Sequence, residues 1–403
     1  MEKAKILIVH NQYKLAGGED TVAQNEGELL QSHGHEVHYY IRRNEEIGRM
    51  NLFGKIKLAL CTFFSWRSYR EIDRIIRQNQ IDVVHVHNTV PLVSCAVYYA
   101  AKKNGCTLVQ SIHNMRMLCP TGLMIRDGRV CEDCVKKGLH CAVKYGCYHG
   151  SKQESAVLAG SIAFHRMIGT YRKVDAYLVT TEFNRKLLEQ VVPAEKIYQK
   201  VFFSGSELKN TEEKKREHFV YVSRIEKLKG IHVILEAFRR MPDKKLVVLG
   251  TGPDEEEAHQ FVENNQMQNV TFLGFQPKTE VEKWLYHAKA LVFPTQWYEG
   301  YPMTIIESFA VGTPIVGSNI GNVGTIVKDG ENGLSFQYDD PADLVKKIEY
   351  LDENPDVALR LEEGARQNFI NEHMAQKVYE RTVEIYTCAA GRQKHAKVSA
   401  DTI

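Results

Sequence analysis

The sequence predicts an α/β protein made of two Rossmann-like, doubly wound parallel-sheet domains that face a cleft. Apolar runs of strand length alternate with helical patterns along the whole chain, which is typical of parallel sheets covered by helices on both faces. The alternation restarts after the polar, charge-rich stretch at residues 204–217, which we interpret as a linker. A chain of 403 residues is long enough to build a separate core in each half.

The first series of strands predicts an N-terminal domain over residues 1–205. Its strand-like runs lie at residues 5–11, 35–41, 81–88, 106–114 and 174–181, with helical patterns near 19–33 and 91–103. Ligands of such domains bind at the carboxyl ends of the strands. The polar residues that follow these runs are therefore the first candidates for function.

The second series predicts a C-terminal domain over residues 206–368. Its strand-like runs lie at residues 218–224, 245–252, 269–275, 290–295 and 313–318. A helical pattern over residues 369–388 is expected to cross back and brace the first domain, and residues 389–403 are expected to form a flexible tail.

Composition excludes several classes of protein. No segment approaches the roughly 18–20 apolar residues of a membrane span, and the N-terminus lacks the pattern of a signal peptide, so we expect a cytoplasmic protein. Residues 1–205 contain 28 Lys and Arg against 19 Asp and Glu, whereas residues 206–403 contain 24 against 31. A basic first half predicts attraction to phosphates or a membrane surface, or is chance surface composition. Aromatic residues do not interleave with the basic ones, so no nucleic-acid partner is expected.

Two glutamates flank a predicted helix in the stretch "YEGYPMTIIESFAVGTPIVGS", residues 298–318. Pro302 fits the first helical position and Gly312 fits the position just past the helix end. The N-terminus of such a helix suits a phosphate, and carboxylates accept hydrogen bonds from sugar hydroxyls. Glu299 and Glu307 therefore predict a nucleotide-sugar pocket, with a plain surface helix glutamate as the alternative for Glu307.

Two cations follow the first strand of the second series. Arg224 and Lys229 precede Gly230, and together they could clamp a diphosphate and stabilise it as a leaving group. A solvated cluster of charges is the alternative. Gly17 and Gly18, after the first strand of the chain, would bring backbone N–H groups close to the same phosphate.

Together these motifs resemble the retaining glycosyltransferases of the GT-B architecture, specifically family 4. The E-x(7)-E motif of that family is matched by Glu299 and Glu307, and its R-x(4)-K pair by Arg224 and Lys229. Its glycine-rich loop is matched by "AGGED" and its histidine after a strand by "SIHN", which contains His113. The resemblance extends from residue 4 to about residue 385.

The resemblance implies the transfer of a sugar from a nucleoside diphosphate, by family habit UDP, with retention at the anomeric carbon. Glu307 would bind the ribose, and Glu299 the hydroxyls of the transferred sugar. Arg224 and Lys229 would hold the diphosphate, and they replace a metal at the transfer site.

The resemblance also implies roles for backbone groups and for the first domain. The N–H groups near Met303 and Thr304 would help to bind the diphosphate, and Gly18 would approach it from the first domain. His113 would lie near the transferred sugar and its acceptor, so the first domain would be the acceptor side. The acceptor would be a glycan or a polyprenyl-linked lipid of surface polysaccharide biosynthesis.

A cysteine-rich insert occupies residues 117–150. Cys131 and Cys134 form a CxxC, with eleven residues between Cys119 and Cys131 and twelve between Cys134 and Cys147. Four thiolates suit a tetrahedral structural zinc site. A subset of surface-polysaccharide transferases has a similar insert, which supports this choice of four. Cys141 is then a spare thiol, His140 and His149 are rival ligands, and reduced cysteines without metal are the alternative.

Basic and apolar residues mix in a helical pattern over residues 49–72, which includes Trp66. Such a helix fits the surface of a membrane, which would place the protein at the inner face of the membrane as a peripheral protein. An ordinary core-facing helix is the alternative.

Two other functions compete with glycosyl transfer. A non-hydrolysing nucleotide-sugar epimerase shares the architecture but does not need the R-x(4)-K pair. The third hypothesis is a non-catalytic protein with a zinc module that binds carbohydrate or nucleotide.

Overall fold

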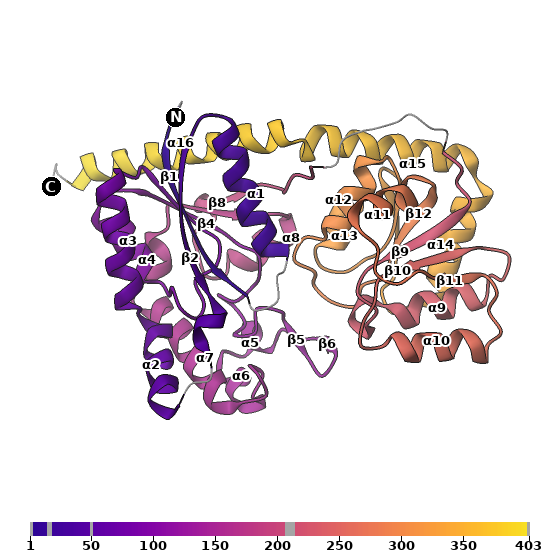
Figure 1. Ribbon diagram of the computed structural model, residues 1–403, viewed down its shortest axis with the longest axis horizontal. Helices are drawn as coiled ribbons and strands as arrows, with labels where there is room; N and C mark the ends of the chain where they lie inside the picture. Colours follow the sequence, from indigo (N-terminus) through magenta and orange to yellow (C-terminus); the bar gives the residue numbers. More distant parts are fainter. Residues whose placement is uncertain (1–2, 14–17, 49–50, 206–213, 401–403) are drawn as a thin grey trace. The chain divides into compact units, whose positions relative to one another are not determined.

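The structure, a computed structural model, describes residues 3–13, 18–48, 51–205 and 214–400. It divides into two compact units, one of residues 1–124, 131–202 and 378–403, the other of residues 125–130 and 203–377. Each unit contains a six-stranded parallel sheet with helices on both faces (Figure 1). The prediction of two parallel-sheet α/β domains is confirmed.

The sheet of the first unit has the strand order β2-β1-β3-β4-β7-β8. The strands are β1 (Lys5–Gln12), β2 (Glu36–Arg43), β3 (Val83–Val86), β4 (Thr107–Ser111), β7 (Ala176–Val179) and β8 (Ile197–Gln199). Every residue of β3, β4 and β7 is buried, as expected for strands covered on both faces. The chain order reverses between β1 and β3, and ligands of open α/β sheets bind at the carboxyl ends of strands at such a point.

Helices cover this sheet and the insert adds short elements. The helices are α1 (Gly18–Ser32), α2 (Leu52–Phe63), α3 (Trp66–Asn79), α4 (Ala96–Lys103), α7 (Lys152–Met167) and α8 (Glu182–Leu188). The insert contains the hairpin β5 (Ile125–Arg126) and β6 (Arg129–Val130), then α5 (Asp133–Lys136) and α6 (His140–Tyr145). The side chains of Asn51 and Ser65 accept hydrogen bonds from the backbone N–H groups of Gly54 and Ser68, and so cap α2 and α3.

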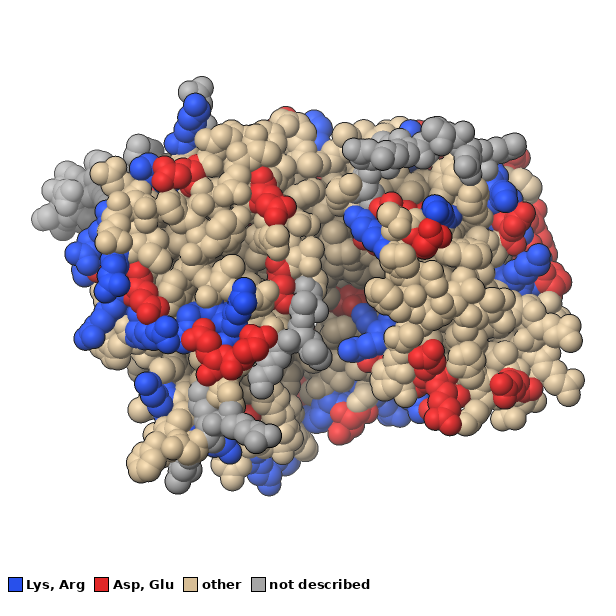
Figure 2. Space-filling view, in the orientation of Figure 1, with Lys and Arg blue, Asp and Glu red and all other residues tan. Residues whose placement is uncertain are grey.

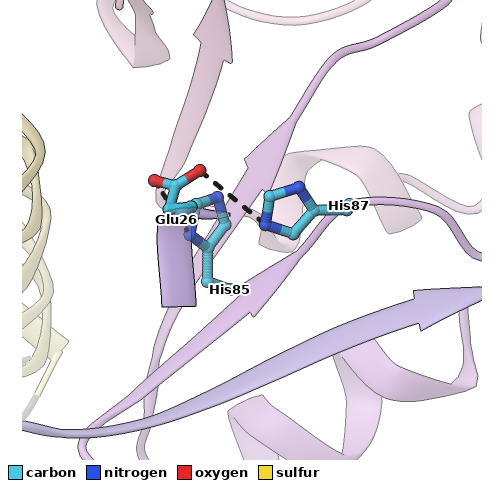
Figure 3. Close-up of side chains that lie close together, drawn as sticks. All are labelled: Glu26, His85 and His87. Atoms are coloured by element: carbon cyan, nitrogen blue, oxygen red, sulfur yellow. Dashed lines mark ion pairs between the residues drawn. The ribbon is translucent and has the colours of Figure 1, made fainter. Parts of the chain in front are cut away.

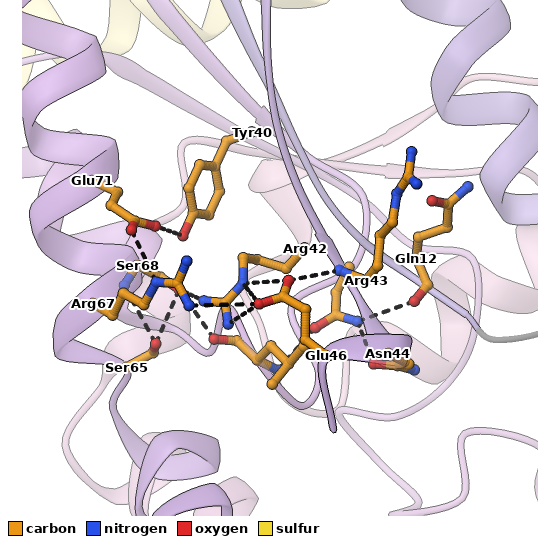
Figure 4. Close-up of polar contacts among 12 residues, drawn as sticks. Gln12, Tyr40, Arg42, Arg43, Asn44, Glu46, Ser65, Arg67, Ser68 and Glu71 are labelled. Carbon is orange, nitrogen blue, oxygen red and sulfur yellow. Dashed lines mark hydrogen bonds and ion pairs between the residues drawn. The ribbon is translucent and has the colours of Figure 1, made fainter. Parts of the chain in front are cut away.

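A network of polar contacts fastens α3 to the end of strand β2 (Figure 4). The buried guanidinium of Arg42 donates to both carboxylate oxygens of Glu46, at 2.8 and 3.0 Å from Nε, and to Ser68 Oγ at 3.3 Å. Tyr40 donates to Glu71 at 2.6 Å. The hydrogen bonds from Arg42 lower the pKa of Glu46. Charge-assisted, bidentate contacts of this kind also fix geometry, so they hold this end of the sheet in register with α3.

The sheet of the second unit has the order β11-β10-β9-β12-β13-β14. The strands are β9 (His218–Val222), β10 (Leu246–Leu249), β11 (Val270–Phe272), β12 (Ala288–Phe293), β13 (Ile315–Ser318) and β14 (Gly333–Phe336). The helices are α9 (Ile231–Arg239), α10 (Glu255–Asn264), α11 (Lys278–Tyr286), α12 (Met303–Ala310), α13 (Val323–Ile326), α14 (Pro341–Glu353) and α15 (Pro355–Asn368). Phe219, Tyr221 and Phe238 lie in one buried cluster between β9 and α9.

The last helix packs on the first unit. A π-helical turn (Phe369–His373) precedes α16 (Ala375–Ala400), whose Ile385, Tyr386 and Ala389 lie in one core cluster with Ile6 of strand β1. The prediction of a flexible tail over residues 389–403 is wrong for residues 389–400, because α16 continues to Ala400, and residues 401–403 lie outside the described residues. Residues 389–400 are rich in Ala, Lys, Arg and Gln, which favour helix, and a helix already held by its buried face extends at little cost.

None of the helices in the described ranges has both the length and the apolar composition that crossing a bilayer requires.

Candidate active site

Lys229 and Glu299 form the centre of the candidate site in the second unit. The ammonium of Lys229 lies 2.8 and 2.9 Å from the two carboxylate oxygens of Glu299. Lys229 comes from the short 3₁₀ helix after β9, and Glu299 from the loop between β12 and α12. Both loops follow the carboxyl ends of central strands, where binding sites of such sheets lie.

Three further side chains hold the Glu299 carboxylate and its loop in one orientation. Thr295 Oγ1 donates to Glu299 Oε1 at 2.9 Å, and Trp297 Nε1 donates to the same oxygen at 2.8 Å. Asn322 Nδ2 donates to the backbone oxygens of Glu299 and Gly300, each at 2.5 Å. A carboxylate fixed in this way is pre-organised to accept hydrogen bonds from a ligand.

Gly230 allows the two loops to approach each other. Its φ is +76°, and a Cβ atom at this position would lie 1.8 Å from the backbone oxygen of Pro294. No side chain fits there, so the residue after Lys229 is a glycine for a geometric reason. This close approach places the ammonium of Lys229 beside Glu299.

Arg224, the other predicted cation, lies apart from this ion pair. Its guanidinium is 2.8 Å from the carboxylate of Glu226, and its side chain is 65% exposed. Its loop passes close to Gly250, where a Cβ atom would lie 2.0 Å from the backbone oxygen of Ser223. The structure thus brings Lys229 and Glu299 into contact and leaves Arg224 at the surface, paired with Glu226.

The predicted helix after Pro302 is α12, which begins at Met303 and ends at Ala310, one residue before the expected end. Gly312 follows with a φ of +66°. The N–H groups of Met303 and Thr304 lie in the first turn, where an anion is stabilised by the helix dipole. Glu307, on the same helix, is half-buried, and burial raises its pKa while Lys278 opposes the rise. Its carboxylate oxygens can accept hydrogen bonds from hydroxyl groups of a ligand.

In the first unit, His113 lies at the end of β4. Its Nε2 is 3.0 Å from Nδ1 of His87, and its ring stacks on Phe202 with centroids 5.5 Å apart. Burial lowers the pKa of His113 to about 3, so the imidazole is neutral at physiological pH. A neutral imidazole offers one donor and one acceptor.

The glycine loop of the first unit is described in part. Gly18 is exposed and opens α1, and a Cβ atom there would meet no other atom within 4 Å. Gly17 lies outside the described residues. Packing therefore does not require glycine at position 18, which is consistent with a position that approaches a ligand.

A small cavity of about 70 Å³ lies beside His113. Its polar lining includes His87, Asn88, Gln110, Asn114, Arg116 and His165. Nε of Arg116 is buried and has no hydrogen-bond partner within the described ranges. An unpaired guanidinium nitrogen at a cavity is a donor available to a ligand or a water molecule.

The cysteines of the insert converge in part. Cys119 and Cys134 are hydrogen-bonded to each other, and Cys134, Cys141 and Cys147 lie in one small cluster. Cys131 is half-buried, and none of these five cysteines, all within the described residues, forms a disulfide. Three of the four predicted ligands are therefore near one another, and the predicted spare, Cys141, lies among them. Thiolates are the ligands that a structural zinc prefers, so the residues fit this metal.

A different group has the closest set of ligand-type atoms in the described part of the chain. One atom from each of Glu26, His85 and His87 lies within 4.8 Å of the other two (Figure 3). Sequence reasoning missed this group, although "VVHVH" places His85 and His87 on the same face of one strand. Asn322, Thr295 and Trp297 were also missed, because loop contacts to a distant carboxylate leave no periodic signal.

Two family models match the chain. Residues 16–199 match the model described as Glycosyltransferase Family 4, and residues 206–368 match the model described as Glycosyl transferases group 1. Glycogen synthase of Mycobacterium tuberculosis is 31% identical over 175 residues, which is 42% of this chain and 42% of that protein. N-acetyl-alpha-D-glucosaminyl L-malate synthase of Bacillus anthracis is 20% identical over 98% of this chain and 100% of its own. The chain thus aligns with less than half the length of the glycogen synthase and with all of the malate synthase.

A solved structure shows the same fold. Anabaena Alr3699/HepE, in complex with UDP, superposes with a TM-score of 0.65 at 14% identity over 95% of this chain and 100% of its own. The two family matches lie one after the other on the two parallel-sheet domains described above. The two domains therefore belong to the two glycosyltransferase families that these models describe, and the chain has the two-domain GT-B fold.

Proposed function

We propose that this protein transfers a sugar from a nucleoside-diphosphate sugar, a UDP-sugar, with retention at the anomeric carbon. The acceptor would be a glycan or a lipid-linked sugar of surface polysaccharide biosynthesis. The observation that carries the proposal is the contact between Lys229 and Glu299, a cation and a carboxylate held at the carboxyl ends of β9 and β12. The UDP complex of the structural neighbour Alr3699/HepE supports the choice of nucleotide.

The donor would be held by the second domain. Glu299 would accept hydrogen bonds from hydroxyls of the transferred sugar, and Glu307 from the ribose. Lys229 would donate to the diphosphate, together with the N–H groups of Met303 and Thr304. Arg224, at the surface of the unit, would turn from Glu226 to the same diphosphate. Because the leaving diphosphate gains negative charge in the transition state, these donors would favour departure more than binding.

The first domain would hold the acceptor. His113 and the donor group of Arg116 border the cavity described above. The acceptor hydroxyl would attack on the face from which the diphosphate departs, and the diphosphate would take its proton. This is the course that retention without a covalent intermediate requires.

Lys229→Ala tests the donor site, with Lys227→Ala as its matched control. Lys227 lies two residues away in the same 3₁₀ helix, but its side chain is 61% exposed and pairs with Glu257. We expect turnover to fall about 100-fold or more in Lys229→Ala, as for removal of one transition-state donor, and to stay near wild type in Lys227→Ala. The assay measures UDP released in the presence of an acceptor from a panel of UDP-sugars.

The same assay separates the alternatives. A nucleotide-sugar epimerase would interconvert the donor without acceptor-dependent release of nucleoside diphosphate. A non-catalytic binding protein would bind nucleotide in calorimetry and release none. Turnover in Lys229→Ala equal to that in Lys227→Ala would contradict the proposed site.

The protein would reach a lipid-linked acceptor through a membrane-facing surface on α2. Phe53, Ile56 and Leu60 are spaced as one helical face, and they are 80%, 51% and 66% exposed. The exposed Phe164, Met167 and Ile168 lie on and just after α7, which packs against α2. Figure 2 shows tan surface over α2 with blue side chains beside it, and Lys55 and Lys57 are exposed on this helix. Apolar side chains next to lysines fit an anionic lipid surface.

Sedimentation with lipid vesicles tests this surface. We expect wild type to bind vesicles that contain anionic lipid, and the double variant Phe53→Ser/Leu60→Ser to bind several-fold less. Phe275→Ser is the control, because Phe275 is 79% exposed but lies in the second unit. Equal vesicle binding by both variants would contradict the proposal.

The insert would hold one structural zinc ion through Cys119, Cys131, Cys134 and Cys147. The ion would join the two ends of an insert that has little apolar core of its own. Elemental analysis should find one zinc per chain in wild type and in Cys388→Ser, an exposed cysteine outside the insert, and a strong loss in Cys134→Ser. A folded, metal-free wild type would contradict it.

A further inference from the structure

A cluster of buried charged and polar side chains lies behind His113 in the first unit. Glu26 of α1, His85 of β3, His87 just after β3 and Lys200 after β8 are each no more than 4% exposed. Nζ of Lys200 lies 2.5 Å from Oε1 of Glu26. Burying an ion pair usually adds little to stability compared with an apolar pair of the same size. A contribution to stability therefore does not explain why the ion pair of Glu26 and Lys200 is buried in the core.

His85 uses both of its ring nitrogens within this cluster. Its Nδ1 lies 2.7 Å from the hydroxyl of Tyr386 on α16, and its Nε2 lies 2.8 Å from Oγ of Ser111. Burial lowers the pKa of His85 to about 4, so the ring is neutral and donates from one nitrogen only. These two contacts fix the orientation of the His85 ring, which lies beside Glu26.

His87 connects Glu26 with His113. Its Nδ1 lies 3.0 Å from Nε2 of His113, and its Nε2 lies 3.8 Å from Oε2 of Glu26. Neither Nε2 of His87 nor Oε2 of Glu26 has a hydrogen-bond partner in the described ranges. The two facing, otherwise unpaired atoms are thus suited to each other, directly or through one water molecule.

The ionisation of Glu26 decides where the proton of His87 lies. Burial alone would raise the pKa of Glu26, but the ammonium of Lys200 outweighs burial and lowers it. An ionised carboxylate only accepts hydrogen bonds, so the neutral ring of His87 faces it with Nε2–H. Nδ1 of His87 is then an acceptor, and Nε2 of His113 must donate to it. The lone pair of His113 is left on Nδ1.

We propose that Lys200, Glu26 and His87 act as positioning residues that set the tautomer of His113. In this arrangement His113 carries its proton on Nε2 and presents Nδ1 as a hydrogen-bond acceptor for a hydroxyl group. The tautomer itself does not depend on the proposed function. The proposed function adds only that the hydroxyl belongs to the transferred sugar or to the acceptor.

A metal ion is the competing occupant of this cluster, since Glu26, His85 and His87 offer three ligand atoms within 4.8 Å (Figure 3). Lys200 already places a positive charge against Glu26, and Tyr386 and Ser111 contact the two ring nitrogens of His85. A cation would have to displace these partners. The contacts therefore favour a chain of hydrogen bonds over a metal site.

Nitrogen NMR of the full-length protein labelled with ¹⁵N-histidine measures the tautomer directly. The signals of His113 are identified by their loss in His113→Gln. We expect Nε2 of His113 to show the shift of a protonated nitrogen and Nδ1 that of an unprotonated one. A proton on Nδ1 in wild type would overturn the inference without any variant, and whether or not the protein transfers sugar.

Removing the ion pair between Glu26 and Lys200 tests whether this pair sets the tautomer of His113. The double variant Glu26→Met/Lys200→Met replaces both charges with apolar side chains and so leaves no unpaired charge in the core. We expect both tautomers of His113 to appear, and kcat/KM to fall about 10- to 100-fold, as for loss of an orienting partner of an active-site group. An unchanged single tautomer in this variant would overturn the inference.

Two further measurements complete the test. Lys102→Met is the control, because Lys102 forms an ion pair with Asp175 at 2.6 Å in the same unit without contacting a histidine. It should leave the tautomer of His113 unchanged, and a change there would overturn the specific role of Glu26. A metal that copurifies with wild type and Cys134→Ser, but is lost from Glu26→Met/Lys200→Met, would also overturn the inference in favour of a metal site.

Discussion

At the scale of the residue, Gly230 is a position where the geometry of the candidate site requires glycine. Gly230→Ala places a Cβ atom 1.8 Å from the oxygen of Pro294, so the loop that carries Lys229 must move. Gly330→Ala is a matched control with a similar φ of +79° and no atom within 4 Å. We expect urea unfolding to show a loss of about 1 kcal/mol for the control, from backbone strain alone, and about 2–4 kcal/mol for Gly230→Ala. Equal losses would contradict the close approach of the two loops.

Glu307 carries a prediction about donor affinity. Glu307→Ala should weaken binding of UDP about 10- to 100-fold, since hydrogen bonds to a charged group contribute roughly 1.5–3 kcal/mol. Glu280→Ala, on the neighbouring helix α11, is the control, because Glu280 pairs with Lys283 at 2.6 Å, and it should bind UDP as wild type does. Titration calorimetry measures both. A full-affinity Glu307→Ala variant would make Glu307 a surface glutamate, the alternative that the sequence left open.

At the scale of the element, α16 holds the first unit together. Its Ile385, Tyr386 and Ala389 are almost completely buried against the sheet. A chain that ends after residue 377 should therefore lose the folded first unit, whereas one that ends after residue 392 should keep it. Circular dichroism and limited proteolysis of the two chains check this. A soluble, protease-resistant first unit in the shorter chain would show that the first unit folds without α16.

The elements also show how far a sequence predicts a structure of this kind. The strand-like runs predicted β1 to β4 and β7 and all but one of the strands of the second sheet, most of them because buried parallel strands have continuous apolar sequence. Two strands of the six-stranded sheets, β8 (Ile197–Gln199) and β14 (Gly333–Phe336), are short and were not among the predicted runs. Pro302 and Gly312 predicted α12 almost to the residue. The helical end of α16 was missed because a weak local preference is decided by tertiary packing.

The candidate site was predictable only in part. The sequence singled out Lys229 and Glu299 as separate motifs, and the structure brings them to 2.8 Å. The sequence did not indicate that Arg224 pairs with Glu226, because oppositely charged residues two positions apart are too common in sequences to predict a contact. The buried pair of Glu26 and Lys200 joins residues 174 positions apart, which no local pattern can show.

At the scale of the whole molecule, buried histidines make the stability of the first unit depend on pH. Burial lowers the pKa of His85 to about 4 and that of His113 to about 3, against 6.5 for an unburied histidine. The unfolded chain therefore binds protons below pH 6.5 that the folded chain does not, so stability is full above that pH and falls below it. Each such histidine removes about 2 kcal/mol between pH 6.5 and pH 5. Glu19 acts in the opposite direction, because burial raises its pKa to about 7.

We expect the histidines to outweigh Glu19, so the midpoint of thermal unfolding of the first unit should fall by several degrees from pH 7.5 to pH 5. Scanning calorimetry resolves the two units if they unfold separately. A first unit that is as stable at pH 5 as at pH 7.5 would contradict the expectation that the buried histidines outweigh Glu19.

Binding of a nucleoside diphosphate by the second domain is the claim on which the proposed activity rests. Titration calorimetry of UDP into wild type, Lys229→Ala and Lys227→Ala tests it most directly. The contact of Lys229 with Glu299 predicts that wild type and Lys227→Ala bind alike and that Lys229→Ala binds at least 10-fold more weakly. Equal affinity in all three proteins, or no binding of UDP or any other nucleoside diphosphate by wild type, would contradict it.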